Sequence, residues 1–572
     1  MRAIHSEMNE NAQCIAPRTN DAPSFRWCRN DLLIVAIASL LSHLYTGIHY
    51  GLWAHATQLP TVFRLMESGV YPGDLFVDSL EQYCSWYWIA VAWLSRIVDT
   101  QGVLVASHLL SRFLLLAAVY ELTGRMCAEK TVRFVVVIIM MLRLQAVLAD
   151  EVLYSALPTH TTFTFPWLVW GLVMAWRGRP VTAGVLLGIG CNFNVMTGLP
   201  ATFVAVVGYL ACSRPSLLRQ SLAGALAWLL IAAPVLWWAS RSPGPDDTEA
   251  YFRTVREIFW WHFDPLRWGP RVYVQFAGLL LTIAVGIVFK PATPFDRQVR
   301  WSLGAIVLTW GVALVASRVP MMESLMRMQL GRTATLAVIM SVPLIAMAAW
   351  AAWQRQRPVD GLVIALLLAG FGAAHGRTTA VILLSLGVFA DLRSTQSWLR
   401  SRLGTPVRML APIALGISAL LFLRPAMLQV LDRSSRGLIR SFEPNWRAVQ
   451  DWARTNTPFD AVFLVPVHER GFRVFSRRAV WLGFDYDAML WRPDLIHEIQ
   501  RRHDRVSATG LCDVPVRSVD WRRLRELADK ESIDFVVMPV VAVADQPTVY
   551  RNPDWAVVAF QTNGEARVPR RP

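Results

Sequence analysis

Long apolar runs separated by short polar gaps are the most regular feature of this 572-residue chain. A helix needs about twenty apolar residues to cross the hydrocarbon core of a membrane. Runs close to that length lie at approximately 32–50, 103–123, 132–148, 161–176, 181–195, 199–212, 220–240, 272–289, 301–317, 333–353, 359–374, 376–390 and 407–423. The pattern therefore predicts an α-helical polytopic membrane protein with about 13 transmembrane helices.

The segment YCSWYWIAVAWLSRIV at 83–98 decides the orientation of these helices. If it lies along the membrane interface and the N-terminus is cytoplasmic, every short cytoplasmic gap carries Lys or Arg, as the positive-inside rule requires. If it crosses, those basic gaps move outside. Its Trp and Tyr side chains favour the headgroup level. We therefore expect an interfacial helix at 83–98 within an outer loop at 51–102, with the N-terminus inside and the C-terminus outside.

The two shortest runs flank the sequence NFNVMTGLP. Two half-helices that meet at residues 198–200 would explain this break, and so would a simple tight turn. We favour the turn.

Hydropathy falls after Leu423, and the remaining length suffices for a small folded domain. NWRAVQDWARTNTP has the periodicity of an amphipathic helix, and WRRLRELADK at 521–530 is also helical in pattern. Strand-like segments lie at 461–467, 472–476, 479–484, 533–541 and 555–560. The expected layout is a flexible cytosolic lead at 1–30, a transmembrane domain at 31–430 and a C-terminal periplasmic α/β domain at 431–572.

Composition agrees with a membrane protein, since 54% of the residues are hydrophobic, only 17% are charged and the mean hydropathy is +0.37. The 56 Lys and Arg outnumber the 41 Asp and Glu, but the surplus sits in the gaps between apolar runs and so does not indicate nucleic acid. The chain contains no GxGxxG, GxxxxGK[ST] or GxSxG motif, and its cysteines lack metal-ligand spacing. Nucleotide-binding and serine-hydrolase functions therefore have no motif support.

Acidic residues gather in two expected outer loops. YPGDLFVDS contains Asp74 and Asp78, and ADEVLYSALPTHTT contains Asp150 and Glu151. An acid at the membrane boundary can accept a proton from an attacking hydroxyl, and a pair can hold a divalent cation beside a phosphate leaving group. The sequence does not decide whether a metal is used.

Each of these acids also has a simpler interpretation. The DSLE sequence at 78–81 is a capping-box pattern directly ahead of the interfacial helix, which explains Asp78. Asp74 lacks such a pattern and is either a catalytic base or a solvated turn acid. Asp150 and Glu151 are either site residues or boundary acids in water.

Cations at the same face would suit a phosphate-bearing lipid. MRMQLGRTATL supplies Arg327, Gln329 and Arg332, and a further expected outer turn supplies Arg377. Arginine binds phosphate oxygens bidentately, although each of these side chains would equally well reach lipid headgroups. The histidines scattered around the same boundary are interpreted as ordinary hydrogen-bonded residues: His43, His49, His55 and His160.

The layout of one span, a large outer loop, a second acidic loop after the third span, further spans and an outer C-terminal domain resembles the GT-C superfamily of membrane glycosyltransferases. QLPTVFRLMESGVYPGDLFVDS, MQLGRTATL and WARTNTPFDAVFLVPVHERGFRVFSRRAV also look like an uncharacterised bacterial family of such proteins. The chain departs from GT-C enzymes soon after the first span, where His49, His55 and Gln58 stand at the usual place of an acid.

The resemblance implies a bacterial inner-membrane enzyme that transfers a sugar from a polyprenyl-phosphate donor to an envelope acceptor on the periplasmic face. Asp74 would be the base, with Asp150 and Glu151 orienting the acceptor or a metal. Lipid-phosphate and substrate contacts would come from Gln58, Arg327, Gln329, Arg332 and Arg377. The alternative is a non-enzymatic protein that binds or moves a lipid-linked intermediate. An ion-coupled transporter ranks last because the spans carry few charges.

Overall fold

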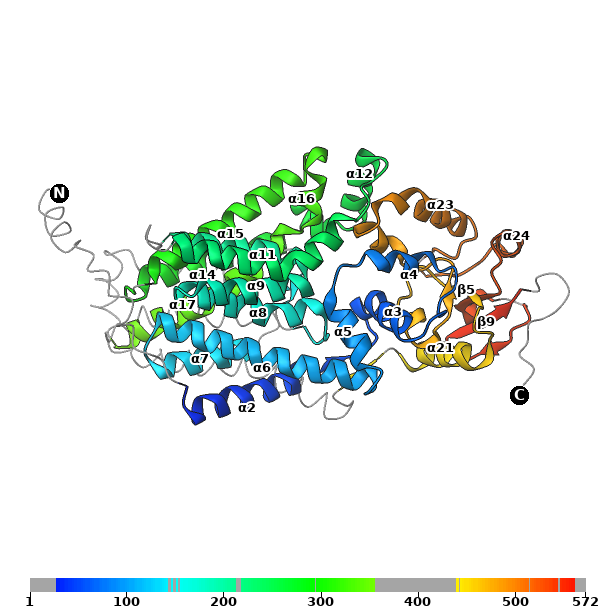
Figure 1. Cartoon of the computed structure of the whole chain (residues 1–572). Coiled ribbons are helices and arrows are strands. Elements are labelled where there is room, and N and C mark those ends of the chain that lie inside the picture. The colour runs from blue at the N-terminus through cyan, green and yellow to red at the C-terminus, as the bar shows by residue number, and fades with distance from the viewer. Residues whose placement is uncertain are drawn as a thin grey trace, which may run out of the picture.

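The computed structural model of this chain describes residues 27–141, 146–147, 151–152, 155–211, 218–293, 295–354, 439–441, 443–513, 515–543 and 546–560. Long helices run side by side in a bundle, and the C-terminal region gathers around one end of it (Figure 1). We call this the capped end of the bundle. The predicted domain boundary at residue 431 lies outside the described residues.

Each predicted span before residue 355 overlaps a helix, although the runs at 32–50 and 132–148 also include the short strands Ile48–His49 and Ala146–Val147. These helices are α2 (Arg29–Thr46), α6 (Thr100–Met126), α7 (Lys130–Met141), α8 (His160–Trp176), α9 (Pro180–Phe193), α10 (Val195–Leu210), α11 (Leu218–Ser240), α14 (Pro270–Phe289), α15 (Asp296–Ala316) and α17 (Ala334–Gln354). Within the described part, four helical stretches are long and apolar enough to cross a membrane: Thr100–Met126, Arg219–Ser240, Asp296–Ala316 and Pro320–Ala348. The chain is thus a multi-pass membrane protein. The predicted spans at 359–374, 376–390 and 407–423 lie outside the described residues, so the total of thirteen stays a prediction.

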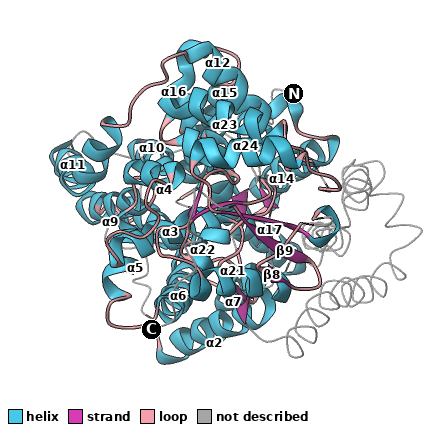
Figure 2. Ribbon diagram, turned by 90° about the vertical axis from the view of Figure 1, so that its right-hand side faces the viewer, coloured by secondary structure: helices cyan, strands magenta, loops and turns pink. Residues whose placement is uncertain are grey.

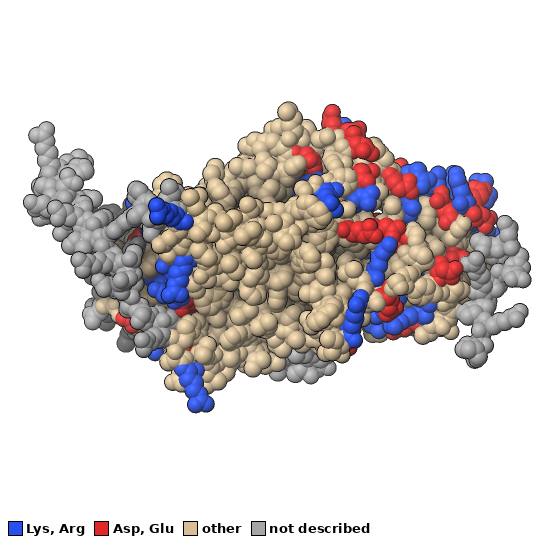
Figure 3. Space-filling model, in the orientation of Figure 1, with Lys and Arg blue, Asp and Glu red and all other residues tan. Residues whose placement is uncertain are grey.

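On the face shown in Figure 3, Lys, Arg, Asp and Glu gather toward the two ends, and the broad surface between them is almost free of these residues. At the end opposite the capped end, buried Glu121 pairs with Arg125 at 3.3 Å and with Arg177. Buried charges persist when they are paired, as Glu121 is here. The positions of the charges fit a membrane around the middle of the bundle.

The break between α9 and α10 is a tight turn, as predicted, but it lies at Asn194 and not at residues 198–200. The Asn194 side chain caps α10 by accepting a hydrogen bond from the Thr197 amide at 3.2 Å. Gly198 sits in the first turn of α10, where an added Cβ would lie 2.6 Å from Cα of Cys191. Glycine is needed there because the two helix ends approach so closely.

The predicted outer loop folds into α3 (Ala54–Met66), α4 (Leu75–Ser79), η1 (Leu80–Gln82) and α5 (Trp86–Leu94). With nine residues, α5 is about 14 Å long, which is too short to cross the membrane. Its place along the membrane interface stays a prediction. Its Trp88 side chain is fully buried, whereas Trp86 and Trp93 are exposed. In Figure 1, α3, α4 and α5 lie between the bundle and the C-terminal region.

Further short elements cover the capped end. They are β1 (Ile48–His49), which pairs in parallel with β4 (Ile439–Arg440), the antiparallel pair β2 (Ala146–Val147) and β3 (Glu151–Val152), α12 (Thr248–Ile258), α13 (Trp260–Phe263), η4 (Pro265–Arg267), η5 (Pro320–Met322), α16 (Glu323–Arg327) and η6 (Leu330–Thr333). The amphipathic α12 packs against the C-terminal region, because the Tyr251 hydroxyl donates to the Met489 carbonyl at 3.1 Å.

A five-stranded sheet in the order β6-β5-β7-β9-β8 forms the core of the C-terminal region (Figure 2). Its strands are β5 (Val462–Leu464), β6 (Ala479–Val480), β7 (Phe535–Pro539), β8 (Tyr550–Arg551) and β9 (Trp555–Ala559). β5 pairs in parallel with β6 and β7, and β9 is antiparallel to β7 and β8. The associated helices are α21 (Pro444–Asn456), α22 (Phe472–Ser476), η7 (Asp485–Leu490), η8 (Pro493–Leu495), α23 (Ile496–Ser507), α24 (Trp521–Glu531) and η9 (Val540–Ala542).

The prediction of a strand at FRVFS was wrong, since these residues form α22. The alternation of apolar and polar residues suggested a strand with one face in water, but all five side chains are buried. Arg473 in this segment is buried because it has charged partners, which periodicity does not reveal. The helices predicted at 521–530 and in NWRAVQDWARTNTP are confirmed as α24 and α21.

Close packing of α9 on α11 generates a prediction about stability. A Cβ added at Gly184 would lie 2.1 Å from the carbonyl oxygen of Gly224, whereas one added at Gly304 on α15 would meet nothing within 4 Å. Gly184→Ala should therefore destabilise the protein by about 1–3 kcal/mol through overpacking. Gly304→Ala should be neutral or slightly stabilising. Thermal unfolding in detergent checks this, and equal effects of the two variants would contradict it.

Candidate functional site

Asp74 begins α4 and is its N-cap. The chain reaches it through a turn in which Tyr71 and Gly73 have positive φ angles of 64° and 71°, and its carboxylate accepts a hydrogen bond from the Val77 amide at 3.1 Å. The capping role expected for Asp78 therefore belongs to Asp74. Asp78 instead lies within α4 and pairs with Arg64. A helix cap explains the position of Asp74, contrary to expectation.

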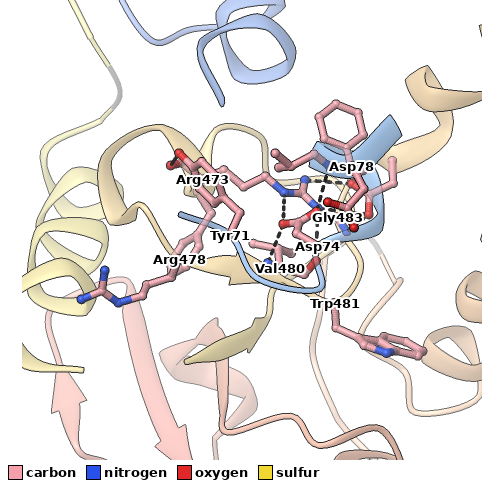
Figure 4. Close-up of polar contacts among 12 residues, drawn as sticks. Tyr71, Asp74, Asp78, Arg473, Arg478, Val480, Trp481 and Gly483 are labelled. Carbon is pink, nitrogen blue, oxygen red and sulfur yellow. Dashed lines mark hydrogen bonds and ion pairs between the residues drawn. The ribbon is translucent and has the colours of Figure 1, made fainter. Parts of the chain in front are cut away.

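Arg473 of α22 binds the same carboxylate (Figure 4). Its Nε donates to Oδ2 of Asp74 at 2.7 Å and its Nη2 donates to Oδ1 at 3.0 Å, while the Val480 amide donates to Oδ2 at 2.8 Å. Nη1 of Arg473 also donates to Asp485 at 2.8 Å. The exposed fractions of Asp74, Arg473 and Asp485 are 1%, 7% and 3%. We call these three residues the ion cluster.

The electrostatics of the ion cluster keep Arg473 charged. Burial by itself lowers the pKa of the Arg473 guanidinium, but Asp485 and Asp74 more than reverse this and raise it. Burial raises the pKa of Asp485, and the Arg473 charge opposes that rise. The ion cluster thus joins the outer loop to the C-terminal region by a charged contact that water does not reach.

Four donors occupy the carboxylate oxygens of Asp74, one from Val77, two from Arg473 and one from Val480. A carboxylate accepts at about four lone-pair positions, so little capacity is left for a substrate hydroxyl. The structure thus gives Asp74 a structural role, and its catalytic role stays a prediction. The other acids of this loop are also paired: Glu67 with Arg477, Asp78 with Arg64, and Glu81 with Arg64 at 3.7 Å.

A second polar cluster lies deeper, where α3, α8 and the segment after η1 meet. Nε2 of Gln58 lies 3.1 Å from the Tyr83 hydroxyl and 3.3 Å from Nδ1 of His160, and the Tyr83 hydroxyl lies 3.2 Å from Nε2 of His160. Gln58 and His160 are only 5% and 6% exposed. Trp88 lies beside the His160 ring. We call Gln58, Tyr83 and His160 the polar triad.

Two charged residues influence the polar triad electrostatically. Burial raises the pKa of the Tyr83 hydroxyl, the Gln58 hydrogen bond and the nearby positive charge of Arg332 oppose the rise, and the negative charge of Asp487 adds to it. Arg332 belongs to η6, and Asp487 belongs to η7 of the C-terminal region. The polar triad therefore lies within electrostatic range of both a cation and an acid.

Buried acceptor atoms near this site have no hydrogen-bond partner among the described residues. They include Oε1 of Gln58 in the polar triad and Oε1 of Gln329, which precedes η6 in a left-handed conformation with φ of 50°. An unsatisfied buried polar atom costs free energy unless a ligand or water meets it. These oxygens are therefore available for donors of a bound molecule.

The predicted site residues thus fall into three groups. Gln58 and Arg332 come together at the polar triad, and Gln329 lies in the turn leading to Arg332. Arg327 lies on α16 and is already engaged by Glu323 at 3.3 Å and by the Ser242 hydroxyl at 3.1 Å. Asp150 and Arg377 lie outside the described residues, and Glu151 belongs to β3.

Sequence reasoning missed Tyr83, His160, Arg473, Asp485 and Asp487. His160 was interpreted as an ordinary buried residue, and Arg473 was hidden in an apparent strand. Asp74 and Arg473 are 399 positions apart, so no local pattern joins them. The one available signal was Arg473 within the segment FRVFS. Arg is almost never fully buried unless it is paired, so burial of this segment would imply an acidic partner.

A cleft opens between the outer loop and the C-terminal region, with an empty volume of about 390 Å³ including its mouth. α3 contributes Thr57 to its lining, and the C-terminal region contributes Glu469, Arg470, Phe484 and Asp487. We call it the interface cleft. Within the described ranges, no group of three or more His, Cys, Asp or Glu side chains is arranged to hold a metal ion.

One family matches part of the chain, a domain of unknown function (DUF6798) that covers residues 444–506. No curated protein sequence matches this chain. The matched segment runs from α21 to α23, and it contains Arg473, Asp485 and Asp487.

Solved structures with a similar layout include two of ArnT from Cupriavidus metallidurans. The one bound to undecaprenyl phosphate has 13% identity and a TM-score of 0.46, and it covers 93% of this chain and 98% of that chain. The apo structure has 15% identity and a TM-score of 0.44, covering 92% and 97%. Arabinofuranosyltransferase AftD from Mycobacteria has 14% identity and a TM-score of 0.43, covering 94% of this chain and 36% of that one. We infer function from this chain's own residues.

We expect loss of the buried Arg473 to destabilise the protein much more than loss of the exposed Arg522. Arg473→Ala leaves two buried carboxylates unpaired and should destabilise docking of the C-terminal region by about 3–5 kcal/mol. Arg522→Ala removes an exposed pair with Glu526 and should cost about 0–1 kcal/mol. Hydrogen exchange of α22 and α4 measures the difference. Equal protection in the two variants would show that the ion cluster does not hold this contact.

Proposed function

We propose that this chain is a membrane glycosyltransferase that takes a sugar from a polyprenyl-phosphate donor and transfers it to an envelope acceptor on the periplasmic face of the bacterial inner membrane. The observation that carries the proposal is the polar triad beside Arg332, at the end of an apolar bundle. A polyprenyl phosphate has an apolar chain and an anionic headgroup. A cation with neutral hydrogen-bonding groups at such a boundary suits that headgroup.

Arg332 supplies the positive charge in this proposal. Its guanidinium would bind phosphate oxygens and stabilise the charge that develops on the leaving phosphate. Tyr83 would remain a neutral hydrogen-bond donor, since burial raises its pKa. The unpaired Oε1 atoms of Gln58 and Gln329 would accept hydrogen bonds from sugar hydroxyls. Asp74, Asp150 and Glu151 are the base candidates that the sequence offers.

The proposed orientation places the capped end in the periplasm and the opposite end in the cytoplasm. The basic gaps between α6 and α7 and between α8 and α9 support this, because they contain Arg125, Lys130, Arg177 and Arg179. Lys and Arg accumulate in short cytoplasmic loops. The polar triad then faces the side on which lipid-linked sugars meet envelope acceptors.

A second candidate function is binding or movement of a lipid-linked intermediate without transfer. The pairing of Glu67, Asp74, Asp78 and Glu81 with arginines favours it, because each acid between residues 67 and 81 already has a cationic partner. The two functions share the lipid-phosphate site and differ only in the need for a base.

Binding of undecaprenyl phosphate tests the shared part of both functions. Arg332→Ala should weaken binding to the purified protein in nanodiscs by about tenfold or more, because a charge-assisted contact is lost. Arg332→Lys should recover part of it. Arg318→Ala is the control, since Arg318 pairs with Asp264 at the same end. Native mass spectrometry measures the bound lipid, and unchanged binding by Arg332→Ala would refute the assigned site.

A pair of isosteric variants separates transfer from binding. Asp74→Asn and Asp485→Asn each weaken the ion cluster, but only Asp74 is a candidate base. If Asp74 catalyses transfer, Asp74→Asn should abolish modification of envelope glycan while Asp485→Asn retains a measurable part of it. Equal glycan profiles in cells that make the two variants at equal levels would remove Asp74 from catalysis. If glycan modification withstands Asp74→Asn but not Arg332→Ala, Asp74 is not the base and Arg332 is still required.

A further inference from the structure

The interface cleft contains an acid that the assignments above leave unused. Asp487 lines it, and its Oδ2 accepts a hydrogen bond from the Thr57 hydroxyl at 2.8 Å. This is the one hydrogen bond of its carboxylate among the described residues, in contrast to the four donors on Asp74. Asp487 therefore retains acceptor positions for a ligand in the cleft.

The rest of the lining is suited to a hydroxylated molecule. Glu469 and Arg470 offer an acceptor and a donor, and Arg470 rests 4.0 Å from the centre of the Phe484 ring. Phe76 and Phe472 add apolar ring surface to the same walls. A few convergent polar groups between apolar walls are typical of small-molecule sites.

The interface cleft and the polar triad are adjacent. Thr57 and Gln58 are neighbours on α3, and Thr57 contacts Asp487 while Gln58 contacts Tyr83. Asp487 and Arg332 both influence the Tyr83 hydroxyl electrostatically. An acid and a cation near the same tyrosine suit a reaction that begins with proton loss and ends with a phosphate leaving group.

We propose that the interface cleft binds the sugar hydroxyl acceptor and that Asp487 is the base that accepts its proton. This inference rests on the proposed glycosyltransferase function. The acceptor oxygen forms a bond to the anomeric carbon of the donor sugar as the bond from that carbon to the phosphate oxygen breaks. The electron pair leaves with the polyprenyl phosphate beside Arg332. The hydroxyl proton moves to Asp487, which later releases it to water.

The environment of Asp487 suits this role. Burial raises the pKa of its carboxyl, and Arg470 and the Thr57 hydrogen bond oppose the rise. Burial also raises the pKa of Glu469. A base works best when its pKa approaches the working pH, so a raised pKa makes a carboxylate a stronger proton acceptor.

Acceptor binding is tested without any transfer step. The full-length protein in nanodiscs is mixed with methyl glycosides of common hexoses and pentoses, and hydrogen exchange is measured across residues 465–487. Wild type should gain protection there. Asp487→Asn and Glu469→Gln should each raise the glycoside concentration needed for half-maximal protection about ten- to hundredfold, because a hydrogen bond to a charged group is lost. Asp451→Asn, an exposed acid on α21, is the control and should match wild type.

Transfer and its pH dependence test the base. Glycan modification should be lost in Asp487→Asn, while undecaprenyl phosphate binding stays within about twofold of wild type, as expected for a change away from the lipid site. In wild type the rate should fall as pH drops through the pKa of Asp487, because the protonated acid accepts no proton. Since burial raises this pKa, the fall should begin above the range usual for an Asp, whose ordinary pKa is about 3.9.

Any of the following outcomes overturns the inference: no glycoside protection in wild type, protection that persists in both cleft variants, or full transfer by Asp487→Asn. Loss of undecaprenyl phosphate binding in Asp487→Asn also overturns it, since the cleft is then not a separate acceptor site. Failure of the proposed function is distinguishable, because wild type would then bind no undecaprenyl phosphate whether or not glycosides protect the cleft.

Discussion

The buried guanidinium of Arg473 holds two carboxylates from distant parts of the chain, and the arrangement of the capped end depends on that contact. Removing three charged groups from water is unfavourable unless each finds its partners in good geometry. Asp74 can satisfy this requirement only when the outer loop and α22 are in place together. The ion cluster therefore acts as a positional constraint, which fixes how the loop after the first span sits against the C-terminal region.

That constraint determines what lies near the polar triad. With α4 held against α22, α3 is oriented so that Gln58 faces Tyr83 and His160 while Thr57 faces Asp487. One helix thus contributes Gln58 to the polar triad and Thr57 to the lining of the interface cleft. The matched family segment at 444–506 carries the partner residues for this helix, which suggests that it serves the capped end as a unit.

The bundle is organised by a different requirement. Its middle band carries almost no charge, and its helices approach closely where small residues meet, as Gly184 and Gly224 do. Lipid tails are as apolar as the helix surfaces, so the hydrophobic effect does not drive these helices together within the membrane. Van der Waals packing and satisfied polar groups hold them together instead. Charged groups such as Glu121 are confined to the ends, where arginines pair with them.

The sequence by itself determined the described helices of the bundle and α21, because apolar run length and periodicity are local properties. It also selected Gln58 and Arg332 as candidate binding residues, whose spatial relation it did not contain. Tertiary structure alone decided the role of Asp74, the helix at FRVFS and the position of Asp487. Each of these depends on partners hundreds of residues away, and the free energy of a buried charge is set by those partners and not by neighbouring positions in the chain.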